Sequence, residues 1–362
     1  MLWAIAAWSA LSAHAQAPTN APASNAVTAP VALALILPGP DTPFSRPSEA
    51  VREGFVAAHA ATRAPLAIQV VEIDASSAQA VEAMRSARDR GVQIIVGPLT
   101  RAAVNGAVAA GDIGVPTLFL NVPEDPGALA ASQLAFGLSV EDEAALLVRA
   151  ALRQVDPGVT ASRARRHVVV AGDGALARRT AAAFVAALRA AAETVVTLDF
   201  ARLGADGVAA AIARTPATAI FLALDVGDAV QVRTRLPIDA PLYATSQINA
   251  AAGGALLAND LEGVRFVDMP WLIDPERAAV RAYPRPAVGY STELQRLYAL
   301  GIDAYRVALE WLAGRRRFEI DGVTGWLRVD RERSARVERM PGFAVFREGR
   351  IERDDSLRDL NR

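Results

Sequence analysis

The chain has 362 residues, 52% of them hydrophobic, and its formal net charge at pH 7 is -1. Disordered and fibrous classes are therefore excluded, two domains of ordinary size are expected, and neither nucleic acid nor an anionic membrane is favoured as the main partner. Lysine is absent, so Schiff-base chemistry and a P-loop lysine are both unavailable.

The first 17 residues are typical of a secretory signal peptide. Leu2 to Leu11 is apolar but too short to span a membrane, and Ala-x-Ala triplets that resemble cleavage sites follow it. An ordinary apolar helix is the alternative. Residues 18–30, rich in Ala, Pro, Asn and Thr, are expected to form a linker. Because the sequence has no cysteine, we expect no disulfides and no lipid anchor, and a periplasmic protein that is soluble after signal-peptide removal.

From residue 31 onward, predicted strands and helices alternate. Strands are expected at 31–37, 67–73, 92–96 and 116–120, and helices at 48–61, 77–90 and 100–110. Ser48 is expected to be the N-cap of the first helix. The continuous apolar run at 92–96 is typical of a strand with helices on both faces of its sheet. Ligands of such sheets bind just beyond the carboxyl ends of the strands, here at residues 97–100.

A second series of similar size follows. Helices are expected at 141–154, 176–191, 208–214 and 228–235, and strands at 167–171, 194–200, 219–224 and 242–245. The acidic residues Glu141 to Glu143 fit the first turn of a helix better than a pair of catalytic acids. Two such series predict two similar α/β lobes, each a doubly wound, mainly parallel sheet.

The last third of the sequence has a different pattern. A strand is expected at 264–268, a Pro-rich loop at 283–286 and the longest helix at 291–313. Short strands at 322–329 and 342–346 are expected to form a terminal hairpin, followed by a frayed tail.

Four stretches resemble, in the same order, the C-terminal domain of the penicillin-binding protein activator (LpoA-like) family. They are Tyr243-Ala-Thr-Ser246, Phe266-Val-Asp-Met-Pro-Trp-Leu272, Arg296-Leu-Tyr-Ala-Leu-Gly-Ile-Asp-Ala-Tyr-Arg306 and Gly322-Val-Thr-Gly-Trp-Leu327. Weaker likeness lies at 97–99 and 136–139. The resemblance implies a two-lobed type I periplasmic binding protein fold, similar to Leu/Ile/Val receptors. Three interlobe crossings are implied, near 136–139, 269–273 and 322–325.

The domain boundaries follow from these crossings. The segments expected are a signal peptide at 1–17, a linker at 18–30, lobe 1 at 31–138 plus 272–322, lobe 2 at 139–271 plus 323–350, and a frayed tail at 351–362. The family binds and stimulates a class A penicillin-binding protein. The resemblance therefore implies a periplasmic, non-catalytic regulator of peptidoglycan synthesis with that partner.

A periplasmic receptor for a small amino-acid-like or polar solute, bound between the lobes, is the alternative function. Residues expected at the cleft are Ser45, Leu99, Thr100, Asn121, Asp173, Thr245 and Ser246. For Thr100 and Ser246, helix capping is favoured over ligand contact. Hinge or interface candidates are Asp268, Trp271 and Trp326; hinge packing is favoured for both tryptophans, and tryptophan is also common at interface hot spots.

Other chemistry has little support in the sequence. Gly172 to Ala177 fits the pattern G-x-G-x-x-A of dinucleotide sites, but a glycine-rich turn between a strand and a helix is favoured. His59 and His167 have no metal-ligand spacing, and no catalytic Ser/His/Asp set can be argued. We therefore expect no enzyme activity, no metal and no cofactor.

Overall fold

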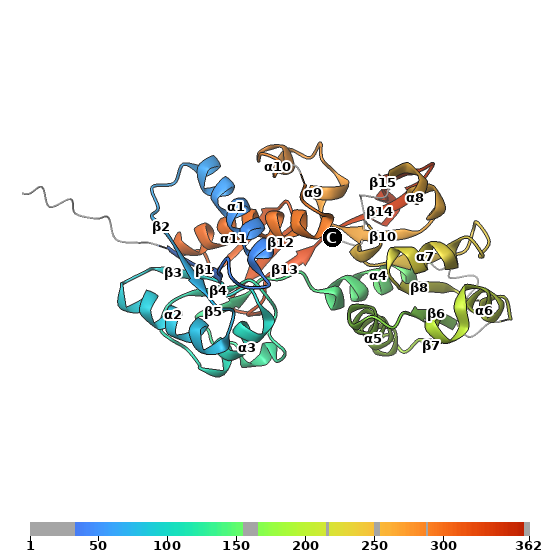
Figure 1. Cartoon of the computed structure of the whole chain (residues 1–362), viewed down its shortest axis with the longest axis horizontal. Helices are drawn as coiled ribbons and strands as arrows, with labels where there is room; N and C mark the ends of the chain where they lie inside the picture. The colour runs from blue at the N-terminus through green and yellow to red at the C-terminus, as the bar shows by residue number, and fades with distance from the viewer. Residues whose placement is uncertain (1–32, 155–165, 215–216, 250–253, 287–288, 358–362) are drawn as a thin grey trace, which may run out of the picture.

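The computed structural model describes residues 33–154, 166–214, 217–249, 254–286 and 289–357. Two α/β lobes lie side by side along the long axis of the molecule (Figure 1). The predicted signal peptide and linker lie outside the described residues.

Lobe 1 is built on a parallel sheet of strand order β2-β1-β3-β4-β5. The strands are β1 (Leu33–Pro38), β2 (Ile68–Ile73), β3 (Ile94–Val96), β4 (Thr117–Phe119) and β5 (Gln133–Ala135). Helices α1 (Ser45–Thr62) and α11 (Thr292–Leu312) cover one face, and α2 (Ser77–Asp89) and α3 (Arg101–Ala109) cover the other. A 3-10 turn, η1 (Pro126–Ala128), precedes β5, a strand that the sequence did not predict.

Lobe 2 is built on a seven-stranded sheet of order β15-β14-β10-β9-β8-β6-β7, parallel from β10 to β7. The strands are β6 (Arg166–Ala171), β7 (Thr194–Asp199), β8 (Ala219–Ala223), β9 (Leu242–Ala244), β10 (Arg265–Asp268), β14 (Gly342–Arg347) and β15 (Arg350–Arg353). Helices α4 (Val140–Gln154) and α5 (Ala175–Ala190) cover one face. The other face carries α6 (Phe200–Arg214), α7 (Val226–Arg233) and α8 (Gly254–Asp260).

A third, antiparallel sheet joins lobe 1 and corrects the predicted third crossing. Its strands are β11 (Arg317–Asp321), β12 (Trp326–Asp330) and β13 (Glu338–Met340). Alternate side chains of this sheet, such as Leu327 and Val329, pack into the lobe 1 core. Residues 323–340 therefore belong to lobe 1, and the chain crosses at Pro341, between β13 and β14, rather than at 322–325.

The ends of three predicted elements also differ. Helix α1 begins one turn before Ser48, with Pro47 in its first turn, so Ser48 lies buried inside the helix and does not cap it. At the C-terminus, β15 pairs with β14 and Leu357 packs in the lobe 2 core. The tail is therefore ordered through residue 357, and the prediction of fraying from 351 was wrong for the described residues.

The end of β3 shows why the turn that follows this strand begins with glycine. Gly97 has φ +103, and a Cβ there would lie 2.1 Å from the carbonyl oxygen of Ile36. Both observations require glycine, since side chains disfavour this backbone region and the neighbouring strand leaves no space. The turn thus keeps the carboxyl ends of β1 and β3 close together.

Candidate functional site at the interlobe junction

Three of the lobe 1 cleft candidates support the edge of the lobe itself. Thr100 Oγ1 accepts a hydrogen bond from Ala103 N at 3.3 Å and caps α3, which confirms the capping prediction. Leu99 is buried in the lobe 1 core. Asn121 Nδ2 donates to Leu99 O at 3.0 Å, and its Oδ1 accepts from Val122 N at 2.9 Å. Ser45, the first residue of α1, is partly exposed. As ligand contacts, these four residues remain predictions.

The lobe 2 candidates divide into exposed and buried ones. Asp173 is exposed in the turn between β6 and α5. Thr245 and Ser246 are buried where β9 leads into the 3-10 turn η2 (Ser246–Ile248). No side-chain hydrogen bond caps this turn, and Ser246 is its first residue, so the prediction that Ser246 caps a helix was wrong. The backbone of Ser246 is what matters here. Its N donates to Glu143 Oε2 at 3.0 Å, and its O accepts from Arg296 Nη2 at 2.8 Å.

Asp268 and Arg296 form a buried ion pair between the lobes. Asp268 ends β10 of lobe 2 and is 1% exposed, whereas Arg296 lies on α11 of lobe 1. Arg296 donates from Nη2 to Asp268 Oδ2 at 2.8 Å and from Nε to Oδ1 at 3.2 Å. Burial opposes the guanidinium charge, but the Asp268 carboxylate outweighs it, so the pKa of Arg296 is raised. Asn249 Nδ2 donates to Asp268 Oδ2 at 2.8 Å, and Met269 N donates to Oδ1 at 2.8 Å. Both oxygens of the Asp268 carboxylate therefore accept hydrogen bonds within the junction.

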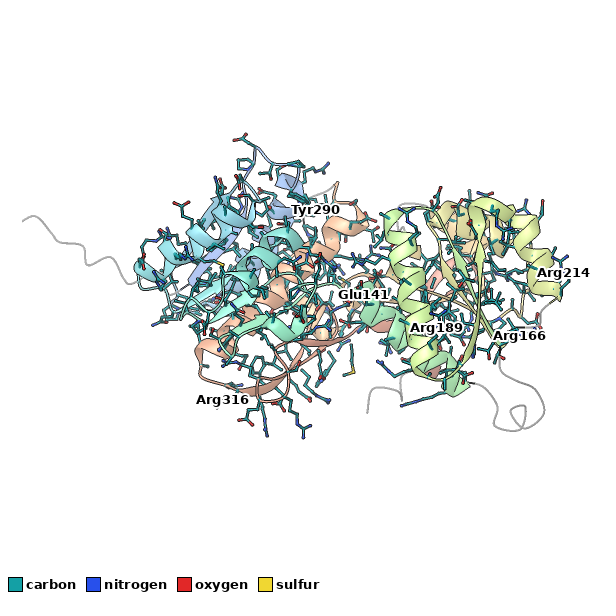
Figure 2. The ribbon with its side chains drawn as sticks, turned by 90° about the horizontal axis from the view of Figure 1, so that it is seen from below. Glu141, Arg166, Arg189, Arg214, Tyr290 and Arg316 are labelled. Atoms are coloured by element: carbon teal, nitrogen blue, oxygen red, sulfur yellow. The ribbon has the colours of Figure 1, made fainter. Side chains whose placement is uncertain are left out.

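The first turn of α4 makes a second set of links. Figure 2 shows Glu141 where the two lobes meet. Glu143 Oε1 accepts from Arg339 Nη2 at 2.9 Å, and the two side chains are 6% and 5% exposed. Asp142 accepts from Arg336 Nη2 at 2.6 Å in a more exposed pair. Arg336 and Arg339 lie just before the third crossing, and α4 lies just after the first. These ion pairs therefore connect the start of α4 in lobe 2 to the end of the β11–β13 sheet in lobe 1.

Asp303 connects these links through lobe 1. It lies fully buried on α11 and accepts from Val323 N at 3.1 Å, Thr324 N at 2.8 Å and Thr324 Oγ1 at 2.7 Å. Burial raises the pKa of Asp303, while Arg306 and the Thr324 donors act in the opposite direction. Arg339 Nη1 in turn donates to Thr324 O at 3.2 Å.

These contacts form a continuous chain of hydrogen bonds that runs from Asp268 to Asp303. Because Arg296 and Asp303 both lie on α11, that helix closes the chain, and we call the arrangement the junction ring. Its members are Glu143, Ser246, Asp268, Arg296, Asp303, Thr324 and Arg339. Lobe 2 supplies Glu143, Ser246 and Asp268, and lobe 1 supplies the other four. Each arginine faces a carboxylate, which is an arrangement suited to holding two parts together.

The two candidate tryptophans lie in different surroundings. Trp271 is buried in α9 (Pro270–Ile273), at the second crossing, where its ring centroid is 5.4 Å from that of Tyr298 and 4.2 Å from the Arg285 guanidinium carbon. Trp326 is 38% exposed on the outer face of the β11–β13 sheet, and its Nε1 donates to Glu319 Oε2 at 3.1 Å. Trp271 therefore packs the junction, and a role in an interface remains a prediction for Trp326.

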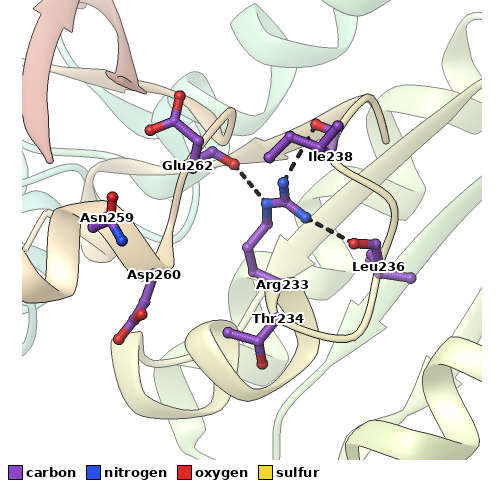
Figure 3. Close-up of a pocket in the computed structure, with 7 residues that line it drawn as sticks. All are labelled: Arg233, Thr234, Leu236, Ile238, Asn259, Asp260 and Glu262. Carbon is purple, nitrogen blue, oxygen red and sulfur yellow. Dashed lines mark hydrogen bonds between the residues drawn. The ribbon is translucent and has the colours of Figure 1, made fainter. Parts of the chain in front are cut away.

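Described residues of lobe 2 line two cavities. One, of about 250 Å³, surrounds Arg233, whose guanidinium donates to the carbonyl oxygens of Leu236, Ile238 and Glu262 (Figure 3). These bonds hold the turns that lead into β9 and β10. The other, of about 270 Å³, lies beside α8 and β15 and includes Asn249 in its wall. Among the described residues, no group of three or more His, Asp or Glu side chains could hold a metal ion.

The sequence did not identify the ring as a site. The sequence features that lie in the ring are the acidic run at the start of α4 and the arginines before residue 340. Glu143 and Arg339 are 196 positions apart, so no local pattern shows that they pair. Only Asp268 and Ser246 of the ring were singled out, one as a hinge candidate and the other as a ligand contact.

Comparison with known proteins gives one family. A model described as "LppC putative lipoprotein" matches residues 23–213 and 201–349. A curated relative, the penicillin-binding protein activator LpoA of Glaesserella parasuis serovar 5, is 26% identical over 317 residues, which cover 84% of this chain and 51% of the relative. LpoA of Haemophilus ducreyi is 25% identical over 316 residues, with the same coverage. The chain thus spans about half the length of the curated relatives it matches.

Solved structures agree on the fold. A putative branched-chain amino acid ABC transporter from Chromobacterium violaceum is 35% identical, with a TM-score of 0.70 over 86% of this chain and 99% of that one. The LpoA C-domain from Haemophilus influenzae is 23% identical, with a TM-score of 0.71 over 89% and 99% of the two chains. The resemblance and the two-lobed type I periplasmic binding protein fold are therefore confirmed.

Attachment to a membrane is a separate matter. In the part of the chain that the structure describes, no helix is long and apolar enough to cross a membrane. The family's description as a lipoprotein family conflicts with the expectation of a chain without a lipid anchor. Residues 1–32, where an N-terminal anchor would be attached, lie outside the described residues.

Proposed function

Because this chain belongs to the LppC putative lipoprotein family, we propose that it regulates peptidoglycan synthesis in the periplasm by binding a class A penicillin-binding protein, with no catalysis of its own. The observation that carries the proposal is the likeness, over 84% of the chain, to a relative named as a penicillin-binding protein activator. The LpoA C-domain of similar fold is described as a regulator of PBP1A, and it corresponds to the part of LpoA that this chain matches.

The chemistry of the interlobe site supports the proposal. A hydrolase or transferase needs a nucleophile or base held ready for a substrate. At the junction, the carboxylates of Asp268 and Glu143 are instead engaged by Arg296 and Arg339 and by backbone or amide donors. Groups used in this way hold a structure, which suits a protein that acts through contact with a partner.

The direct test is binding. The mature chain, immobilised on a sensor, is exposed to a purified class A penicillin-binding protein, and a leucine-binding protein of the same fold serves as the control. We expect saturable binding to the chain and none to the control. Equal signals on both surfaces, or no signal on either, would overturn the proposed partner.

A receptor for a small amino-acid-like solute is the second candidate. It is favoured by the 35% identity to the protein from Chromobacterium violaceum, over 99% of that chain, and that protein is named as a putative branched-chain amino acid transporter. The capped N-terminus of α3 at the cleft edge would offer amide groups to a carboxylate. Thermal unfolding with a library of amino acids separates the two functions. A receptor gives a saturable rise in Tm with one solute, whereas the proposed regulator gives none.

A further inference from the structure

The junction ring links the three places where the chain passes between the lobes. Glu143 lies just after the first crossing, Asp268 just before the second, and Arg339 just before the third. The ring includes two cross-lobe ion pairs, and the side chains of Arg296, Asp268, Arg339 and Glu143 are all at most 11% exposed. Any rotation of one lobe against the other acts on both pairs at once.

A hinge that closes on a ligand requires contacts that can change cheaply between two states. Buried ion pairs do not meet this requirement, because separating the partners leaves charges in a site that water does not solvate. The bidentate geometry at Asp268, with Arg296 bonded at 2.8 Å and 3.2 Å, is also sensitive to direction. Arg296 contacts the carbonyl oxygens of Ser246 and Asn249 as well, so rotation would break four hydrogen bonds of one side chain.

We propose that the junction ring is a lock that holds the two lobes at one fixed angle, so that the chain does not close around a ligand. This inference goes beyond the proposed function and does not depend on the identity of the partner. A ligand shifts a conformational equilibrium only where a second state exists. With a single interlobe angle, a solute bound between the lobes would not close them. Both lobes then present their surfaces to a partner at a constant separation.

Ion pairs elsewhere in the chain provide matched controls. Arg317 pairs with Asp330 and Glu332 within lobe 1, and its side chain is mostly exposed. Its replacement removes an arginine from an ion pair, as the replacement of Arg296 does, but without affecting the junction. If the ring fixes the angle between the lobes, replacing Arg296 changes that angle and replacing Arg317 does not.

The test measures the angle between the lobes directly. Because the sequence has no cysteine, Val56→Cys on α1 and Ile238→Cys before β9 place two spin labels, one in each lobe, at sites that are 47% and 69% exposed. Pulsed electron paramagnetic resonance then gives the distribution of label distances. We expect one narrow peak, unchanged by millimolar leucine, isoleucine or valine. Arg296→Met should broaden or shift the peak, Arg296→Lys should do so less, and Arg317→Met should leave it unchanged.

Two results would overturn the proposal. One is a wild-type distribution with two peaks, or one that shifts when amino acid is added. The other is an unchanged narrow peak in Arg339→Met and Arg296→Met when their circular dichroism is native. If Arg296→Met does not fold, Arg339→Met and the wild-type measurement still decide the outcome. Binding to a penicillin-binding protein plays no part in this test, so its result is independent of the proposed function.

Discussion

Acidic side chains in two regions of this molecule have opposite surroundings. At the junction, Asp268 and Glu143 are buried and paired with arginine. At the rim of lobe 2, Asp173, Asp225 and Asp228 follow β6 and β8, and none of the three forms an ion pair with another described residue. Partial burial, with Asp225 and Asp173 nearby, raises the pKa of Asp228. Carboxylates thus pair with arginines across the lobes at the junction, whereas at the rim Asp225 caps α7 and Asp173 is exposed to solvent.

The largest predicted difference between the two regions is in stability. Arg296→Met should lower the free energy of unfolding by about 3–5 kcal/mol, because it leaves Asp268 buried without its charged partner. Asp173→Asn at the exposed rim should change it by no more than about 0.5 kcal/mol. Urea unfolding followed by circular dichroism measures both. Equal losses would contradict the distinction between junction and rim.

The second prediction concerns coupling between partners. A double-mutant cycle with Glu143→Gln and Arg339→Met should give a coupling energy of about 1–3 kcal/mol, since this pair is buried and shares a network. The same cycle with Asp330→Asn and Arg317→Met should give less than about 1 kcal/mol, because water screens the exposed Arg317 guanidinium, which also pairs with Glu332. A larger coupling for the exposed pair would show that burial does not explain the strength of the ring.

A smaller effect is expected at the cleft edge of lobe 1. Thr100→Ala should cost about 1 kcal/mol of stability through loss of the α3 cap, and Thr100→Ser should restore most of it. Thermal unfolding of the three proteins checks this. If Thr100→Ala instead left stability unchanged and abolished binding of an amino acid, Thr100 would be a ligand contact and the edge a working receptor site.

The last prediction concerns alkaline pH and Tyr290, which donates from Oη to Glu53 Oε2 at 2.8 Å. Burial and the Glu53 carboxylate raise the pKa of Tyr290 to about 12. Because this folded-state pKa lies above the unfolded value of about 10, the contribution is complete below about pH 10 and is lost as the pH rises through 12. The difference in ultraviolet absorbance between the wild type and Tyr290→Phe, measured as the pH is raised, should show the ionisation of Tyr290 near pH 12. A difference curve centred near pH 10 would refute it.

The alternation of strands and helices was predictable because burial dictates it locally. The run at 92–96 has no polar face, and the structure covers β3 with helices on both sides. Thr100 was also predictable as a cap, since its hydroxyl needs only a neighbouring amide.

The third crossing and the junction ring could not be located from the sequence, because both depend on contacts between residues that are far apart along the chain. Leu327 and Val329 alternate with polar residues in the same way whichever lobe they face, so periodicity could not assign β12 to lobe 1. Arg296 lies 28 residues from Asp268, and no local pattern distinguishes it from the other arginines. The pairs form only when the fold brings the three crossings together, which the sequence indicated only through resemblance.

Glycan polymerisation measures directly whether this chain regulates a class A penicillin-binding protein. The initial rate of a class A penicillin-binding protein on a lipid-linked precursor is measured against increasing concentrations of the wild-type chain, with and without a mixture of leucine, isoleucine and valine. We expect a saturable increase that is the same in both conditions, since a regulator with fixed lobes needs no solute. No increase, or an increase only when amino acids are present, would contradict it.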